Sequence, residues 1–257
     1  MRSILLLLVL CSVSLPAAAQ TAGSIVLQAG WLHIQTLDSS KPLHSDVQPG
    51  LGAIIGIPDS FDSPGTSAKV SNADTLVLAS SYFVTDHLAV KFEGGIPPDF
   101  DLYGKGKVQP NPNINALSVD LGAHNPIASS KQWSPALLFQ YYFRHPEATW
   151  RPYLGVGVTY TWFTNVELSD GFAGDLNTTF GRSLALANGK FPIDGTYVNA
   201  KSSPDWAPIV NAGLSYAFNK RWGVSASVSY VDLKTTSTID IFAADGTRLS
   251  RSTTDID

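Results

Sequence analysis

Pro152 to Trp162 reads PYLGVGVTYTW, and its residues alternate in kind at every step. One set of alternate positions is apolar or aromatic: Leu154, Val156, Val158, Tyr160 and Trp162. The other set is Tyr153, Gly155, Gly157, Thr159 and Thr161. A period of two is typical of a β-strand whose two faces meet different surroundings. The same alternation recurs in residues 210–218 and 222–230, so the sequence predicts a sheet of several such strands.

The apolar face of each of these strands carries small or branched residues in its middle and aromatic residues at its ends. The six Trp, at 31, 133, 150, 162, 206 and 222, also fall at expected strand ends or beside turns. Alternation occurs in soluble β-sandwiches too, so it does not identify the solvent. Aromatic girdles at both ends of an apolar band are typical of a membrane-spanning barrel. We therefore favour a transmembrane β-barrel over a soluble sandwich.

The spacing of the strands supports the same interpretation. We expect seven visible strands, over residues 24–36, 75–83, 88–96, 133–143, 151–164, 206–218 and 222–234. Their connections alternate between short turns and three long loops, at about 37–74, 97–132 and 165–205. Such long loops are uncommon in compact soluble domains. Short periplasmic turns and long extracellular loops are the pattern of outer-membrane barrels, so the sequence predicts an all-β, antiparallel transmembrane barrel.

Composition and charge exclude several functions. Lys and Arg number 17 against 21 Asp and Glu, so no basic excess favours nucleic acid as a partner. A single Cys excludes a disulfide framework and multi-cysteine metal sites, and we expect neither a metal nor a cofactor. The few charges inside strands are informative. Lys91 and Glu93 alternate with apolar neighbours, and we expect both to face the lumen because ionised groups are rarely tolerated toward lipid.

The N-terminus has the pattern of an export signal. Arg2 supplies the positive charge, Ile4 to Leu10 form an apolar core, and Ala17 to Ala19 form a small-residue cleavage site. The apolar run is short of the ~20 residues that a membrane-spanning helix needs. We therefore expect residues 1–19 to be a signal peptide, cleaved after Ala19, and residues 20–257 to be the barrel.

Five segments carry a resemblance to a known family: Tyr82–Val90, Pro135–Phe143, Arg151–Tyr160, Leu214–Trp222 and Tyr230–Leu233. In these segments the chain resembles the OmpW family of small Gram-negative outer-membrane barrels. The resemblance implies an eight-stranded barrel in the cell outer membrane, with a narrow and largely apolar channel for small hydrophobic molecules. The resemblance also implies a lateral opening in the barrel wall. The implied partners are these small hydrophobic ligands, outer-membrane lipid with lipopolysaccharide, and the barrel-assembly machinery.

One feature departs from the family. Family members continue past the position of Asp257 with a last strand that ends in an aromatic residue, and this strand is missing here. Residues 235–257 instead predict an extracellular hairpin that turns at Ala243 to Gly246. Open strand edges are not viable in hydrocarbon because their N–H and C=O groups lack partners. We therefore expect that the chain is truncated or that the eighth strand is supplied otherwise, and that the chain as it stands does not close.

No motif points to catalysis. The five His are scattered, and the sequence His44-Ser45-Asp46 holds the residue types of a triad only as neighbours. Triads assemble in space rather than along the chain, so a solvated loop is the simpler interpretation. We expect no enzyme. Two alternatives to a channel stay open: a closed structural or adhesive barrel that acts through its extracellular loops, and a less favoured lipid-modifying barrel enzyme.

Strand parity suggests which side chains line a ligand path. If Phe83 and Phe143 face outward, six large side chains point into the lumen: Leu76, Leu78, Tyr82, Leu138, Tyr142 and Tyr153. They form either an apolar ligand path or the simple packing of a narrow barrel. Ile54 and Ile55 lie in an apolar segment, residues 51–57, of the first long loop. We expect this segment to be covered, either by other loops or as the wall of an entry vestibule.

Overall fold

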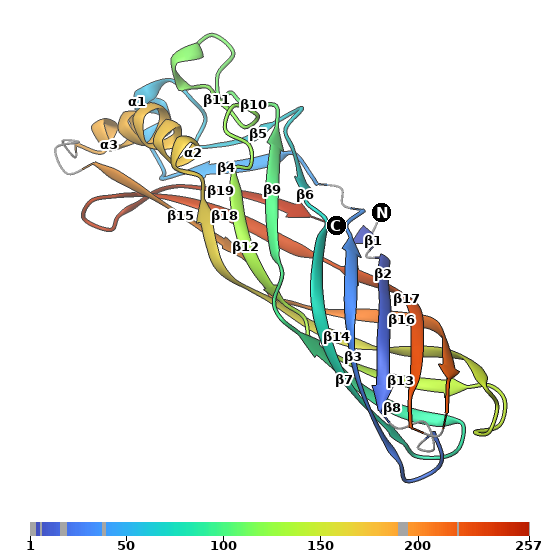
Figure 1. The fold of residues 1–257 in the computed structure, drawn as a ribbon. Coiled ribbons are helices and arrows are strands. Elements are labelled where there is room, and N and C mark those ends of the chain that lie inside the picture. The colour runs from blue at the N-terminus through green and yellow to red at the C-terminus, as the bar shows by residue number, and fades with distance from the viewer. Residues whose placement is uncertain are drawn as a thin grey trace.

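The computed structural model describes residues 4–5, 7–15, 20–37, 40–189, 195–219 and 221–256, with side chains from residue 20 onward. Figure 1 shows an elongated molecule with a barrel at one end and a folded cap at the other. No helix in the described part of the chain is long and apolar enough to span a membrane.

Eight antiparallel strands pair in a ring to form the barrel. In ring order they are β2 (Leu7–Leu15), β3 (Ile25–Gln35), β7 (Ala73–Phe83), β8 (Leu88–Gly95), β13 (Ala136–Tyr142), β14 (Trp150–Leu168), β16 (Asp205–Ala217) and β17 (Gly223–Leu233). A two-residue strand, β1 (Ile4–Leu5), also pairs with β17. The seven expected strands are all present, because period-two alternation marks each of them.

The eighth strand comes from an unexpected part of the chain. β2 pairs with β17 from Gly223↔Ser14 to Ser229↔Leu8, and with β3 from Leu27↔Leu15 to Gln35↔Leu7. The expectation that β3 and β17 stay open edges in the chain as it stands is therefore wrong for this structure. The physical reason is that β2 has 9 residues, about what a tilted strand needs to cross the hydrocarbon core. Cleavage after Ala19 stays a prediction.

Side-chain exposure confirms the predicted facing of β14. On β14, Leu154 and Val156 are exposed while Tyr153 and Thr159 are buried. The predicted inward facing of Lys91 and Glu93 is also confirmed, since their side chains are 3% and 14% exposed and form an ion pair. The barrel therefore has an apolar outer face and a mixed interior.

Two aromatic bands border this outer face. One band includes Tyr160 and Trp206, whose ring centroids lie 4.8 Å apart, and the other includes Trp150. Ten residues of β14 separate Trp150 from Tyr160, or about 33 Å at ~3.3 Å per residue. A strand tilt of about 40° reduces this to about 25 Å along the barrel axis, the usual height of the lipid-facing band.

The long connections fold into a cap, built from residues 40–71, 97–132, 165–189, 195–202 and 235–256. Its strands are β4 (Leu43–Val47), β5 (Ser60–Ser63), β6 (Ser67–Val70), β9 (Asp99–Lys105), β10 (Lys107–Val108), β11 (Val119–Asp120), β12 (Ala128–Trp133), β15 (Thr196–Ser202), β18 (Thr235–Ala243) and β19 (Arg248–Ile256). Its helices are α1 (Leu51–Ile55), α2 (Asp170–Asp175) and α3 (Arg182–Ala187), with a 3-10 turn at Asn115–Leu117 and a π-helical turn at Leu176–Gly181.

Two larger sheets, the two-stranded sheet β10-β11 and one hydrophobic core make up the cap. The first sheet continues the barrel upward in the order β14-β12-β9-β6, and the second has the order β15-β18-β19-β4-β5. Phe172, Leu184 and Leu249 are almost fully buried in this core. Residues 235–256 form the hairpin β18–β19 of the second sheet. The three connections treated as loops thus contain a second core, which lies at the opposite end of the molecule from the short turns (Figure 1).

Candidate functional site

Three aromatic side chains fill the end of the lumen next to the short turns. The ring centroid of Tyr142 lies 5.0 Å from that of Phe83 and 4.8 Å from that of Tyr153. All three side chains are nearly fully buried, with Val26 and Ala89 against them. These three rings therefore occupy the lumen at the short-turn end of the barrel.

Arg151 completes this closure. Its guanidinium carbon lies 5.2 Å from the Tyr142 ring centroid and 6.0 Å from that of Phe83, within cation–π range. Its nitrogens donate to the backbone carbonyl oxygens of Gln20, Asp86, Phe143 and Arg144. One buried cation therefore joins the chain at Gln20 to the turns at residues 84–87 and 144–149.

A polar layer fills the next level of the lumen. Lys91 Nζ lies 2.5 Å from Glu93 Oε2. Gln140 Nε2 donates to Asn211 Oδ1 at 2.9 Å, and Asn211 Nδ2 donates to Ser229 Oγ at 2.7 Å. Tyr142 OH donates to Gln140 Oε1 at 3.2 Å, which joins this layer to the aromatic one. Buried polar groups in such a network are held in place because each would be costly to leave unpaired.

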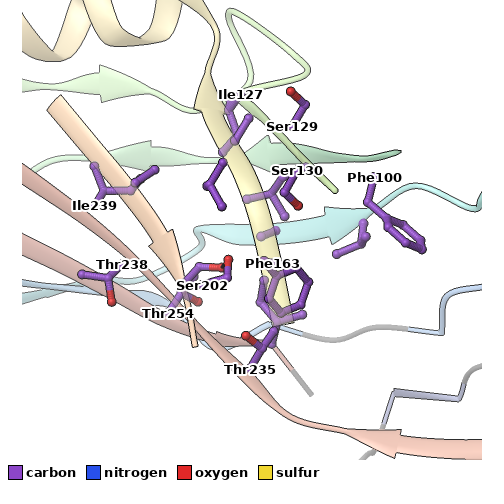
Figure 2. Close-up of a pocket in the computed structure, with 18 of the residues that line it drawn as sticks. Phe100, Ile127, Ser129, Ser130, Phe163, Ser202, Thr235, Thr238, Ile239 and Thr254 are labelled. Atoms are coloured by element: carbon purple, nitrogen blue, oxygen red, sulfur yellow. Dashed lines mark hydrogen bonds between the residues drawn. The ribbon is translucent and has the colours of Figure 1, made fainter. Parts of the chain in front are cut away.

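A cavity of about 110 Å³ lies between the barrel rim and the cap core, and we call it the cap cavity. Figure 2 shows side chains from both cap sheets around it, among them Ile127 and Ile239. Phe100 and Phe163 add aromatic surface, while Ser and Thr hydroxyls lie between the apolar side chains. Apolar surface with a few polar groups is typical of a small-molecule site.

A second cavity of about 70 Å³ lies inside the upper barrel, and we call it the wall cavity. Leu32, Val77 and Ile209 supply apolar lining, and Pro97 and Pro98 border it at the end of β8. Proline has no N–H to donate to a ladder. The wall cavity therefore adjoins a weak place in the barrel wall.

The backbone ladder beside these prolines is interrupted. Ile96 N donates to Leu76 O at 3.0 Å, and the next ladder bond runs from Ser71 N to Asp101 O at 2.9 Å. In the fully described span 40–189, no backbone hydrogen bond joins residues 72–74 to residues 97–100. The wall here has a seam without ladder bonds.

The predicted ligand-path residues divide into two groups. Leu138, Tyr142 and Tyr153 face inward as expected, with 1%, 3% and 2% exposure. None of these three borders either cavity, since they fill the lumen below the cavities. The structure thus places them in the lumen, and their role in a ligand path stays a prediction.

The inward facing of Leu76, Leu78 and Tyr82 is wrong. These side chains are 59%, 69% and 48% exposed on the outer face of β7. The expectation assumed that Phe83 faces outward, whereas Phe83 is 1% exposed and its ring packs at a tilt against the ring of Tyr142. A one-residue error in parity moves every side chain of a strand to the other face.

The apolar segment of the first connection forms α1 and is only partly covered. Leu51 and Ile57 are buried in the cap core, and Ile55 packs against it. Ile54 is 66% exposed, contrary to the expectation that the whole segment is covered. A helix turns one of its faces to water, so Ala53 and Ile54 stay exposed. Neither Ile54 nor Ile55 borders the cap cavity or the wall cavity.

Sequence reasoning missed the cavity-lining residues of β9 and β12. Phe100, Ile127 and Gln132 lie within the span 97–132, which lacks a sustained alternation and was treated as one loop. The pair Pro97-Pro98 was the one local signal available, since two adjacent residues without N–H groups interrupt a ladder.

Two adjacent strands of the cap bring together Ser60, His44 and Asp62. His44 Nδ1 lies 2.7 Å from Asp62 Oδ1, and His44 Nε2 lies 3.3 Å from Ser60 Oγ. The hydrogen bond to Asp62 raises the pKa of His44, with Asp46 adding to the effect. The three side chains are exposed and border neither cavity. No cluster of three metal-ligating side chains occurs in the described part of the chain.

Comparison with known proteins identifies the family. A model of the OmpW family matches residues 22–257. Outer membrane protein W of Salmonella typhimurium is 26% identical over 220 residues, which are 86% of this chain and 78% of the relative. Outer membrane protein W of Vibrio cholerae is 25% identical over 225 residues, or 88% of this chain and 81% of the relative.

Two further proteins are similar. Outer membrane protein AlkL of Ectopseudomonas oleovorans is 26% identical over 173 residues, which are 67% of this chain and 57% of that protein. The crystal structure of the outer membrane protein OprG from Pseudomonas aeruginosa has the same fold, with a TM-score of 0.60 and 20% identity over 93% of this chain and 91% of that one. With the barrel, the aromatic bands and these matches, the chain belongs to the OmpW family and is a β-barrel of the cell outer membrane.

Proposed function

We propose that this barrel passes small hydrophobic molecules from the cell exterior into the outer membrane. The observation that carries the proposal is the position of two apolar cavities above a filled lumen. A ligand enters the cap cavity, moves to the wall cavity and leaves sideways through the seam beside Pro97 and Pro98. Each step keeps an apolar solute out of water, which favours transfer by roughly 25 cal/mol per Å² of buried apolar surface.

The filled lower lumen supports lateral exit. Passage toward the short turns would separate the Lys91–Glu93 pair or displace Arg151 from its carbonyl partners. Leaving a buried charge without its partner costs several kcal/mol. An apolar ligand offers no replacement for these interactions. Exit through the seam disturbs neither group, because no ladder bond closes residues 72–74 against residues 97–100.

Blocking the cap cavity tests the proposal. Ser130→Trp places a large side chain in the cap cavity, and Ala116→Trp places the same side chain on the exposed cap surface. We expect cells that produce Ser130→Trp to take up n-octane no faster than cells without the protein. Cells that produce Ala116→Trp should match those with the unaltered chain. Equal uptake by both variants, each shown to be folded by heat-modifiable migration, would contradict the proposal.

The filled lumen favours a second candidate, a closed structural or adhesive barrel whose cap carries the function. Its supporting observation is the network that joins Tyr142, Gln140 and Asn211, which stabilises the barrel without serving passage. If this candidate is right, cells that produce the unaltered chain and cells that produce Ser130→Trp both take up n-octane at the rate of cells without the protein. Both proposals include insertion of the chain into the outer membrane by the barrel-assembly machinery. A lipid-modifying enzyme is less favoured, because Ser60, His44 and Asp62 border neither cavity.

A further inference from the structure

The cap cavity and the wall cavity have two lining residues in common, Gln132 and Leu233. Gln132 lies near the end of β12, and Leu233 is the last residue of β17. Both are buried, at 8% and 4% exposure. The two cavities therefore meet at these two side chains.

Hydrogen bonds hold Gln132 in one orientation. Its Nε2 donates to Ser134 Oγ at 2.9 Å, and Ser134 Oγ lies 2.9 Å from Thr161 Oγ1. Its backbone N donates to Pro98 O at 3.1 Å, which fixes β12 against the proline pair. Gln132 is therefore attached through its side chain to Ser134 and through its backbone to Pro98 at the border of the seam.

The orientation of Gln132 leaves one acceptor free. Within the described residues, no group donates a hydrogen bond to Gln132 Oε1. The hydroxyls of Ser129, Ser130 and Thr238, which border the cap cavity, likewise have no hydrogen-bond partner in the described residues. A molecule with one uncharged polar group can hydrogen-bond to these atoms while its apolar part contacts the surrounding side chains.

We propose that Gln132 is the selector between the two cavities, and that it favours neutral amphiphiles with a hydroxyl head over plain hydrocarbons of the same length. Leu233 supplies the apolar half of the constriction, and the carbonyl of Gln132 accepts the ligand's hydroxyl proton in a hydrogen bond. This inference rests on the proposed function, since it names the ligand class and the limiting residue of the same route.

Single cysteines placed in the two cavities test the route. Ser130→Cys reports on the cap cavity, and Ala136→Cys reports on the wall cavity. Cells that produce either full chain are treated with N-ethylmaleimide, and the modified peptide is quantified by mass spectrometry, which separates it from any peptide that carries Cys11. We expect both cysteines to react. A second substitution, Gln132→Trp, should slow modification at Ala136→Cys at least tenfold and leave modification at Ser130→Cys unchanged.

The outcomes separate the inference from the proposed function. No modification of either cysteine in a folded barrel would overturn both. Modification at Ala136→Cys that does not change with Gln132→Trp would overturn the selector and leave the channel proposal standing, because the ligand would then reach the wall cavity by another route. Folding of every variant is checked by heat-modifiable migration.

The preference for a hydroxyl head is tested with two competitors of equal chain length and with a variant of Gln132 of similar size. We expect 1-octanol to protect Ala136→Cys from N-ethylmaleimide several-fold better than n-octane at equal concentration. Gln132→Leu keeps the size of the side chain but removes the acceptor, and the difference between the two competitors should then disappear. Equal protection by 1-octanol and n-octane in the chain with Gln132 would overturn the preference for a hydroxyl head.

Discussion

Arg151 Nη1 donates hydrogen bonds to both oxygens of Gln20, 3.0 Å from the backbone carbonyl and 3.2 Å from Oε1. Arg151 is 1% exposed, and its other donors contact carbonyl oxygens of two turns. A guanidinium suits this place because its five N–H groups fan out in a plane. The short-turn end of the barrel thus depends on one side chain that joins three segments distant in sequence.

Arg151→Leu should destabilise the folded barrel by about 3 kcal/mol or more, because several buried carbonyls lose their donor and each costs about 1–3 kcal/mol. The measurement is the free energy of unfolding from a denaturant titration in lipid vesicles. Arg151→Lys is the control and should recover only part of the loss, since an ammonium group has three donors on a single nitrogen. A loss below about 1 kcal/mol for Arg151→Leu would show that water replaces the lost donor.

Val156→Arg should cost about 2–4 kcal/mol of folding free energy, because Val156 is exposed midway between the aromatic bands. Tyr160→Arg is the matched variant on the same face of the same strand. It lies within an aromatic band, where the expected cost is about 0–1 kcal/mol. Refolding titrations into vesicles measure both values. Equal costs would mean that β14 does not cross the membrane at the depth inferred here.

Gly213→Ala should cost about 1–3 kcal/mol through overpacking. Gly213 pairs with Tyr153 across β14 and β16, and a methyl group at Gly213 would overlap the Tyr153 ring. In the Tyr153→Leu background the same substitution should cost less, because the shorter side chain leaves space. A double-mutant cycle of unfolding free energies measures this coupling, and an unchanged cost in both backgrounds would rule the contact out.

His44 should titrate above its ordinary pKa of 6.5, because its hydrogen bond to Asp62 favours the protonated ring. Asp62→Asn should bring the pKa of His44 back toward 6.5, as measured by NMR of the imidazole protons. A raised pKa adds to the stability of the folded cap. This contribution is fully present below pH 6.5 and disappears as the pH rises through the folded-state pKa. The contribution is small because the pair of His44 and Asp62 is exposed to solvent. A pKa that does not respond to Asp62→Asn would contradict this cause.

Removal of residues 1–19 should abolish the closed ring of this structure. β2 pairs with both β3 and β17, and without it the backbone groups of these two edges face hydrocarbon. The measurement is heat-modifiable migration of residues 20–257 after refolding in detergent, with the full chain as the control. A folded, protease-resistant band from residues 20–257 alone would show that the two edges find another way to close.

The seven strands that follow residue 20, and the outer face of most of them, could be predicted from local sequence patterns. Period-two alternation is a local property, and the aromatic residues at strand ends mark the membrane interfaces, so both are visible without tertiary contacts. The alternation of short and long connections likewise placed the cap at one end of the barrel.

The facing of β7, the eighth strand and the two cavities depend on long-range contacts that no local pattern predicts. Phe83 is apolar whichever way it points, and its ring turns inward because Tyr142 and Arg151 of other strands lie there. Gln132 borders both cavities because β12 pairs with β9 on one side and with β14 on the other. No local periodicity in the sequence predicts this pairing. Such contacts join residues far apart in the chain, so their energies depend on the assembled barrel rather than on any segment of the sequence.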